Sequence, residues 1–206
     1  SPILFSKAVS ALSGPTDPII LPEGVTQVDG EVELAVVIGR AARRVAERDA
    51  FAYVAGYTVL NDVTDRAAQR AASQWFRGKS PDTFCPLGPF LVTRDEIYDP
   101  HRLRLTSTIN GRMLQDGNTA DLIFNIPFLI AFISATITLQ PGDIIATGTP
   151  AGIGSARNPP VFLKAGDRIE CAVEGVGRQQ NPIVKSSAVA ASGVPPGKPT
   201  PAFQPS

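Results

Sequence analysis

"GEVELAVVIGR", residues 30–40, alternates between two kinds of side chain and therefore predicts a β-strand. Successive side chains of a strand point to opposite faces, so one face carries Glu31 and Glu33 about 6 to 7 Å apart. Carboxylates this close repel each other, and more strongly when they are partly buried. We expect a positive charge between them, although a solvated edge strand would also tolerate the pair. The other face is predicted to lie in the core and carries Val32, Leu34, Val36 and Ile38.

A third carboxylate, Asp62, comes at the end of another predicted strand and just before a predicted helix, in "VLNDVTDR", residues 59–66. Such a position suits either a functional aspartate or a residue that caps a helix N-terminus. Three oxygen ligands without a nearby histidine or cysteine suit Mg²⁺ or Mn²⁺. The sequence thus presents Glu31, Glu33 and Asp62 as candidate ligands of one divalent cation.

The overall composition argues against several classes of partner. The 206 residues include 19 Lys and Arg and 19 Asp and Glu, so the formal net charge is zero. Nothing in this balance indicates binding to nucleic acid or to an anionic membrane. Cys85 and Cys171 are far apart and lack the spacing of a metal site. Two isolated cysteines are typical of a reducing compartment, so we expect the protein in the cytoplasm.

The chain contains a single histidine, His101, in the turn-like segment "YDPHRL" at residues 98–103. We expect an ordinary loop histidine there. A Ser-His-Asp triad would have to use this one residue, and one chain cannot form a zinc site with several histidines. If the protein is an enzyme, carboxylates, a lysine or a bound metal must carry the chemistry.

The pattern along the chain predicts many short strands and few helices, which indicates an α+β, mainly β fold. The apolar segment 122–139 approaches the length of a membrane span, but Asn125 and Pro127 interrupt it, so we interpret it as a core helix. Asn110 and Gly111 predict the type I′ turn of a hairpin. The expected elements are strands in 18–38 (with a break at 22–24) and at 57–63, helices at 49–56 (closed by Gly56) and 64–75 (capped by Thr64), an irregular loop from 77, a hairpin at 102–117, the core helix at 122–139, and strands within 142–154 and 162–177.

Several of these segments together resemble the fumarylacetoacetate hydrolase family, from about Leu4 to Val184. They occur in the family's order and with ordinary spacing, which makes the combination far more specific than any one motif. The segments are "GEVELAVVIGR", "GYTVLNDVTDRAAQ", "QWFRGKSPDTFCPLGPFLVT", "NGRMLQDGNTADLIF", "LQPGDIIATGTPAGIG" and "FLKAGDRIECAVEGVG".

The resemblance implies a role for each matching residue. Glu31, Glu33 and Asp62 would bind one Mg²⁺ or Mn²⁺, which would explain why two glutamates share a strand face. Lys79 would be the active-site lysine, with a charge able to stabilise a developing enolate. The same resemblance makes Arg66 and Gln69 substrate-facing residues, and gives Gly148 and Thr149 of the Gly-Thr-Pro loop the task of holding the substrate carboxylate.

The resemblance also implies an activity and an architecture. The family fold is a β-sandwich-like roll with flanking helices, its members are usually homodimers, and the catalytic domain here would span 1–184 before a disordered tail at 185–206. The implied reaction is hydrolysis of a C–C bond in acylpyruvate-like diketo acids through a metal-stabilised enolate. Decarboxylation or isomerisation of 2-oxo or hydroxymuconate-type acids is the alternative on the same site, and a metal-binding scaffold without turnover is a third.

Two departures from the family pattern bear on hydrolysis. Many members carry a His and a Glu in an N-terminal lid that activates water, upstream of the segment matching "LFSK", residues 4–7. No counterpart of that pair is present, so we expect either that the sequence lacks its natural N-terminus or that the protein works without the lid. Ala67 also stands where the family usually has Asp, which we expect to loosen the support of Arg66 or of the metal.

Overall fold

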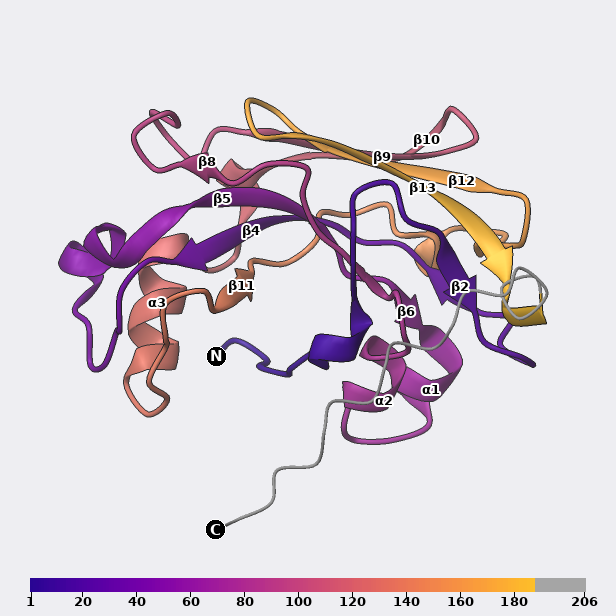
Figure 1. Cartoon of the computed structure of the whole chain (residues 1–206), viewed down its shortest axis with the longest axis horizontal. Coiled ribbons are helices and arrows are strands. Elements are labelled where there is room, and N and C mark those ends of the chain that lie inside the picture. The colour runs from indigo at the N-terminus through magenta and orange to yellow at the C-terminus, as the bar shows by residue number, and fades with distance from the viewer. Residues whose placement is uncertain (188–206) are drawn as a thin grey trace, which may run out of the picture.

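The computed structural model describes residues 1–187, and most of its strands belong to two sheets (Figure 1). The larger sheet has five strands in the order β10-β9-β12-β13-β2, and the smaller has four in the order β11-β4-β5-β8. All neighbours are antiparallel except β13 and β2, which are parallel. The strands are β2 (Ile19–Leu21), β4 (Val32–Ile38), β5 (Val54–Asn61), β8 (Val92–Thr93), β9 (Arg104–Ile109), β10 (Arg112–Asn118), β11 (Ile144–Ala146), β12 (Arg168–Val173) and β13 (Gly177–Lys185).

Two small two-stranded sheets complete the strand structure. One pairs β1 (Leu12–Ser13) with β7 (Cys85–Pro86), and the other pairs β3 (Val28–Asp29) with β6 (Thr64–Asp65). The β3–β6 pair lies just before β4 and just after β5 in sequence, so it extends the pairing of those two strands. This extension matters for the site because residues 29–33 and 61–66 then run side by side.

The two large sheets face each other and enclose the main hydrophobic core (Figure 1). The predicted apolar face of β4 belongs to that core, with Val32, Leu34 and Val36 fully buried. Both faces of β4 are covered, since Ala35 on the glutamate side is also buried in a smaller cluster with Leu60. The arrangement is the expected α+β fold, a mainly β roll of packed sheets with flanking helices. The predicted hairpin is confirmed, because Asn110 and Gly111 have the positive φ values of a type I′ turn between β9 and β10.

The helices are shorter than the sequence predicts. They lie beside the β4–β5 layer, with α3 at one end and the pair α1 and α2 at the other (Figure 1). In place of an α-helix at 49–56 there is a 3₁₀ helix, and Gly56 belongs to β5, where it lies against the backbone of Val92 rather than closing a helix. The helical segments are η1 (Val9–Ala11), η2 (Glu47–Tyr53), α1 (Arg66–Arg70), α2 (Phe76–Lys79), η3 (Thr119–Asp121), α3 (Ile126–Ser134) and η4 (Gly154–Ala156).

The helix expected at 64–75 begins later and is capped differently. Asp65, not Thr64, caps α1, because its carboxylate accepts the N–H groups of Ala67 and Ala68. The chain then turns and forms α2, so Lys79 ends a helix rather than lying in an irregular loop. Asp62 is therefore free of any capping role and can belong to a site.

The helix expected at 122–139 contracts to the nine residues of α3. Asn125 caps it by accepting the N–H of Phe128, and Pro127 lies in its first turn as predicted. His101 is not simply a loop residue, since its Nε2 accepts the N–H of Ile126 at 3.2 Å. Within residues 1–187 we find no helix whose length and apolar character would let it cross a bilayer. The tail predicted from 185 lies outside the described residues from 188 onward, and β13 reaches Lys185.

Candidate metal centre and active site

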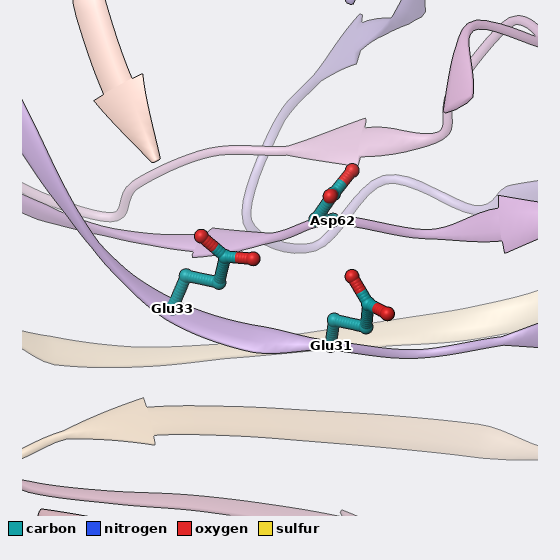
Figure 2. Close-up of side chains that lie close together, drawn as sticks. All are labelled: Glu31, Glu33 and Asp62. Carbon is teal, nitrogen blue, oxygen red and sulfur yellow. The ribbon is translucent and has the colours of Figure 1, made fainter. Parts of the chain in front are cut away.

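Strand register brings the three predicted metal ligands together. In the β4–β5 pairing Val32 lies opposite Asn61, so Glu31 comes opposite Asp62, and the backbone N–H of Asp62 donates to the Glu31 carbonyl at 2.9 Å. Glu33 lies two residues further along the same face. Each residue offers a carboxylate oxygen, and the three oxygens all lie within 4.8 Å of one another (Figure 2). All three side chains are buried, so the carboxylates form one cluster inside the protein.

Lys79 completes this cluster from the end of α2. Its Nζ donates to Glu31 Oε2 at 2.7 Å and also donates to Asp62 Oδ2. Only 2% of the residue is exposed. Burial lowers the pKa of Lys79, but the negative charges of Asp62 and Glu31 outweigh burial and hold that pKa above its ordinary value. The side chain is therefore a fixed positive charge in contact with two of the three carboxylates.

Arg66, at the start of α1, is buried against the same cluster. Its Nη2 donates to Glu31 Oε1 at 2.5 Å, and its Nε and Nη2 donate to Asp29 at 3.1 and 3.0 Å. The remaining Nη1 donates to Gln69 Oε1 at 3.1 Å, so Arg66 and Gln69 do share one location. Their predicted contact with substrate stays a prediction, because here the guanidinium holds protein carboxylates.

Asp29 is a member of the cluster that the sequence interpretation missed. Besides Arg66, it accepts the backbone N–H groups of Gly154 and Ser155, both at 2.9 Å. It is fully buried. The signal was present, since residues 29, 31 and 33 continue one alternation of acidic side chains. Asp29 links the carboxylate cluster to the segment after the glycine loop.

Lys7 was also missed, although it ends the "LFSK" segment. Its Nζ donates to Asp62 Oδ1 at 2.6 Å, to the Val63 carbonyl at 3.2 Å and to the Lys79 carbonyl. Asp62 therefore lies between two lysines, with one on each carboxylate oxygen. The cationic side chains contact Glu31 and Asp62 rather than Glu33, because α1, α2 and the N-terminal segment approach the cluster from that side. The positive charge expected between Glu31 and Glu33 stays a prediction.

The glycine loop reaches the cluster through Glu33. The N–H of Gly148 donates to Glu33 Oε2 at 2.7 Å, with Gly148 at φ 104°, a conformation that favours glycine. Thr149 Oγ1 donates to the Val32 carbonyl at 2.9 Å and accepts from Gln115 Nε2 at 2.7 Å. The structure thus places Gly148 and Thr149 at the site, and their predicted contact with a substrate carboxylate stays a prediction.

The charges of the cluster fit a bound cation. The four carboxylates of Asp29, Glu31, Glu33 and Asp62 face the three cationic side chains of Lys7, Arg66 and Lys79, which leaves a formal charge of −1. Glu33 contacts none of these cations, and its hydrogen-bond partner is a backbone N–H. Burial, with the charges of Asp62 and Glu31, raises the pKa of Glu33 well above its ordinary value. A divalent cation beside Glu33 would relieve this repulsion, so the donor set suits such an ion.

A cavity of about 830 Å³ opens beside the cluster and includes Glu33 in its wall. The loop 147–151 forms another part of the wall, and residues 1–5 and 116–124 contribute further parts. Phe5 lies over Lys79, with its ring centroid 5.0 Å from Nζ, and packs edge-on against Trp75. The cluster is therefore next to a space large enough for a small organic acid.

Comparison with known proteins identifies the family. The family described as "Fumarylacetoacetate (FAA) hydrolase C-terminal" matches residues 1–184. The chain belongs to the fumarylacetoacetate hydrolase family. The predicted resemblance is thereby confirmed, and the fold agrees with that of solved members.

Individual family members carry names of several related activities. The chain is 50% identical to a mitochondrial oxaloacetate tautomerase of Rattus norvegicus over 185 residues, which are 89% of this chain and 59% of the relative. It is 47% identical to a 2,4-didehydro-3-deoxy-L-rhamnonate hydrolase of a Sphingomonas species over 184 residues, 88% of this chain and 65% of the relative. The named activities are thus hydrolysis and tautomerisation.

Solved structures of the family show the same fold. A 5-carboxymethyl-2-hydroxymuconate delta-isomerase from Mycobacterium smegmatis superposes with a TM-score of 0.84 and 41% identity, over 90% of this chain and 70% of that chain. A maleylpyruvate hydrolase from Sphingobium sp. SYK-6 superposes with a TM-score of 0.79 and 42% identity. The match covers 87% of this chain and 63% of that chain. Fumarylacetoacetate hydrolase family members are therefore enzymes of the hydrolase, isomerase and tautomerase classes.

The chain spans 59% of the length of the vertebrate tautomerases that it matches. Those relatives are named as mitochondrial proteins, whereas the sequence led us to expect the cytoplasm. The cytoplasmic location stays a prediction.

Proposed function

We propose that this chain catalyses Mg²⁺- or Mn²⁺-dependent reactions of 2-oxo acids that pass through an enolate, with keto–enol tautomerisation as the leading activity. The observation that carries the proposal is the position of Lys79. Its buried ammonium group lies against Glu31 and Asp62, two of the three candidate metal ligands. A fixed positive charge next to a cation site suits a reaction in which negative charge develops on the substrate.

Glu31, Glu33 and Asp62 would hold the cation, which when bound supplies Lewis-acid polarisation of the substrate's 2-oxo carbonyl. Lys79, held against Glu31 and Asp62, would supply positive charge from behind these ligands as the 2-oxo oxygen gains negative charge and a proton leaves the adjacent carbon. Water in the cavity would accept this proton and return one to carbon or to oxygen, and the two outcomes are the keto and enol forms with nothing else consumed. Arg66 would keep Glu31 oriented, because it donates to one oxygen of that carboxylate while Lys79 donates to the other.

C–C bond hydrolysis of acylpyruvate-like diketo acids is the second candidate, since it uses the same enolate as its leaving group. It is supported by the 47% identity to a named hydrolase and by the likeness to a maleylpyruvate hydrolase structure. Tautomerisation is supported by the 50% identity to named oxaloacetate tautomerases. Hydrolysis also needs a group that activates water. His101 does not line the cavity, and its Nε2 is occupied by the N–H of Ile126.

The test follows the ultraviolet absorbance of an enol. Enol oxaloacetate and an acylpyruvate are each mixed with enzyme and Mg²⁺ or Mn²⁺, then with excess chelator. Chelator-sensitive conversion of oxaloacetate between its tautomers, without pyruvate or carbon dioxide, is the expected result. Cleavage of the acylpyruvate to pyruvate and a second acid would select the hydrolase instead, and release of carbon dioxide would select decarboxylation.

A variant pair separates the site from the scaffold. Glu33→Gln keeps the acceptor for the Gly148 N–H and removes one ligand charge, so activity and Mn²⁺ binding should both be lost. Glu23→Gln, at an exposed position, is the matched control. Full activity of Glu33→Gln without Mn²⁺ binding would rule out a metal-dependent reaction at this site. Binding of Mn²⁺ with no turnover of any 2-oxo acid would favour a scaffold role.

We also propose the homodimer that is usual in this family. Light scattering on the eluting protein would give its mass in solution, and a mass of one chain would contradict the proposal.

A further inference from the structure

The charged side chains that line the cavity beside Glu33 are all acidic. Among the described residues that line it, the charged side chains are Glu33, Asp116 and Asp121, and no lysine or arginine side chain contributes. Arg104 donates two hydrogen bonds of 2.7 Å to Asp116. Its guanidinium is therefore already paired with a protein carboxylate, and Arg104 does not line the cavity. Asp121 is exposed. A second carboxylate on a ligand would meet acidic side chains here, with no lysine or arginine side chain of the described wall to receive it.

The rest of the wall away from the glycine loop is mostly apolar. Ile123 and Phe124 follow Asp121, and Leu129 and Ile133 come from α3. Ile123 is 90% exposed, so the wall carries a large apolar side chain that nothing in the described chain covers. Apolar surface of this kind gains most from contact with a hydrocarbon group.

The three cations of the site are all at the carboxylate cluster. Lys7, Arg66 and Lys79 each contact a cluster carboxylate, and none of them lines the cavity. The cluster carries a formal charge of −1, so a divalent cation would change it to +1, and one substrate carboxylate would then balance the charge. The cation-loaded cluster would thus attract the carboxylate next to the 2-oxo group, while the described residues of the cavity wall supply no lysine or arginine side chain for a distal one.

We propose that the cavity accepts 2-oxo acids whose distal end is uncharged and apolar, and that Asp121, Ile123 and Phe124 discriminate against a distal carboxylate. This inference rests on the proposed function and names its substrate class more narrowly. It concerns the group that lies beyond the reacting carbons. Oxaloacetate carries its second carboxylate directly on the reacting carbon and has no longer distal chain, so its turnover does not test this discrimination.

The test compares two acylpyruvates of equal chain length, one with a terminal methyl group and one with a terminal carboxylate. We expect kcat/KM to favour the methyl compound by about tenfold at low ionic strength, as unscreened repulsion of roughly 1.4 kcal/mol would give. High salt should reduce the preference, because salt screens exposed charges. Equal values, or a preference for the carboxylate, would overturn the proposal while leaving the proposed function intact.

Unreactive oxamates with the same two tails give a readout independent of turnover. Their binding is measured by the increase in Tm in the presence of Mn²⁺, and the methyl compound should again bind more tightly. If neither oxamate binds, neither acylpyruvate reacts and oxaloacetate is not tautomerised, the proposed function fails and this inference fails with it; if oxaloacetate alone reacts, only this inference fails. The first of these outcomes differs from binding with the wrong preference, which overturns the inference alone.

A charge reversal tests the wall directly. Asp121→Lys should move the kcat/KM ratio about tenfold toward the carboxylate compound, because an attractive charge replaces a repulsive one. Glu23→Lys makes the same change of charge at an exposed position outside the cavity wall and should leave the ratio unchanged. An equal response of both variants would assign the effect to net charge and contradict a role for Asp121.

Discussion

Asp29 and Arg66 are joined by two hydrogen bonds, from Nε at 3.1 Å and from Nη2 at 3.0 Å, and both side chains are buried. The pair fixes the guanidinium so that its Nη2 also reaches Glu31. Asp29 in turn accepts the N–H groups of Gly154 and Ser155. One buried aspartate therefore orients both the arginine beside a candidate metal ligand and the chain that follows the glycine loop.

Asp29→Asn should destabilise the protein by about 3 kcal/mol, because it leaves Arg66 with one fewer buried negative partner. Urea unfolding followed by circular dichroism measures the loss as a lower midpoint. Glu23→Gln, which neutralises an exposed carboxylate, should leave the midpoint unchanged. A midpoint for Asp29→Asn equal to that of the wild type would show that the buried pair contributes nothing net.

Lys79→Met should lower kcat by about 100-fold, as removal of one charge-stabilising donor does in other active sites. It should not weaken Mn²⁺ binding, since the substitution removes a cation that contacts Glu31 and Asp62. Electron paramagnetic resonance of Mn²⁺ measures the binding, and Lys164→Met, at an exposed lysine, is the control. Loss of Mn²⁺ binding in Lys79→Met would mean that the lysine supports the shape of the cluster instead.

Divalent cations should stabilise the folded protein through the carboxylate cluster. At a concentration 100 times the Kd, binding to the folded state alone adds about 2.7 kcal/mol to the free energy of unfolding. Differential scanning calorimetry with Mn²⁺ and with chelator should therefore show a higher Tm with the ion. The same increase in Glu33→Gln would place the stabilising ion elsewhere.

Gly154→Ala should disrupt the structure because the site has no room for a side chain. A Cβ there would lie 1.9 Å from the Val161 carbonyl oxygen and 2.8 Å from Asp29 Oδ1. Gly24→Ala is the comparison, since nothing lies within 4 Å of its Cβ and its φ of 76° costs only about 1 kcal/mol. Thermal unfolding should show a much larger loss of Tm for Gly154→Ala. Similar losses would mean that the segment at 154 moves aside freely.

The thiol of Cys85 should react slowly at neutral pH, because burial raises its pKa to about 11. Burial also raises the pKa of Cys171. Because burial raises the folded-state pKa of Cys85, the stability that its neutral thiol contributes is complete below the unfolded pKa of 9.0 and is lost as the pH rises through about 11. Alkylation of native protein at pH 7.5 should leave both unlabelled, and denaturant should expose both. Rapid labelling of the native state would contradict their burial.

The sequence predicted the parts of the site that depend on strand alternation. Glu31 and Glu33 follow from the period of β4, and the apolar face opposite them is buried as expected. Asp62 could be suspected from its place after a strand. Its partnership with Glu31 required the register of β4 against β5, which depends on residues of both strands and on the turns that connect them.

The parts that the sequence did not predict depend on tertiary contacts. Lys7 is 55 residues from Asp62 in sequence, so no local pattern links the two. The predicted helices at 49–56 and 64–75 had wrong boundaries because tertiary structure overrode local helix propensity. Gly56 pairs within β5 instead of ending the first helix, and Asp65 instead of Thr64 caps the second. The short α2 that buries Lys79 forms within a segment rich in turn residues, which predicted a loop.

Residues 31 and 62 lie opposite each other only when β4 and β5 pair in the native register. A slip of one residue would send one carboxylate to the other face of the sheet and divide the cluster. During refolding, Mn²⁺ binding would therefore count only the chains that have aligned these two strands correctly, whereas far-ultraviolet circular dichroism would count every chain that has formed sheet. A delay between the two signals would give the lifetime of misaligned intermediates.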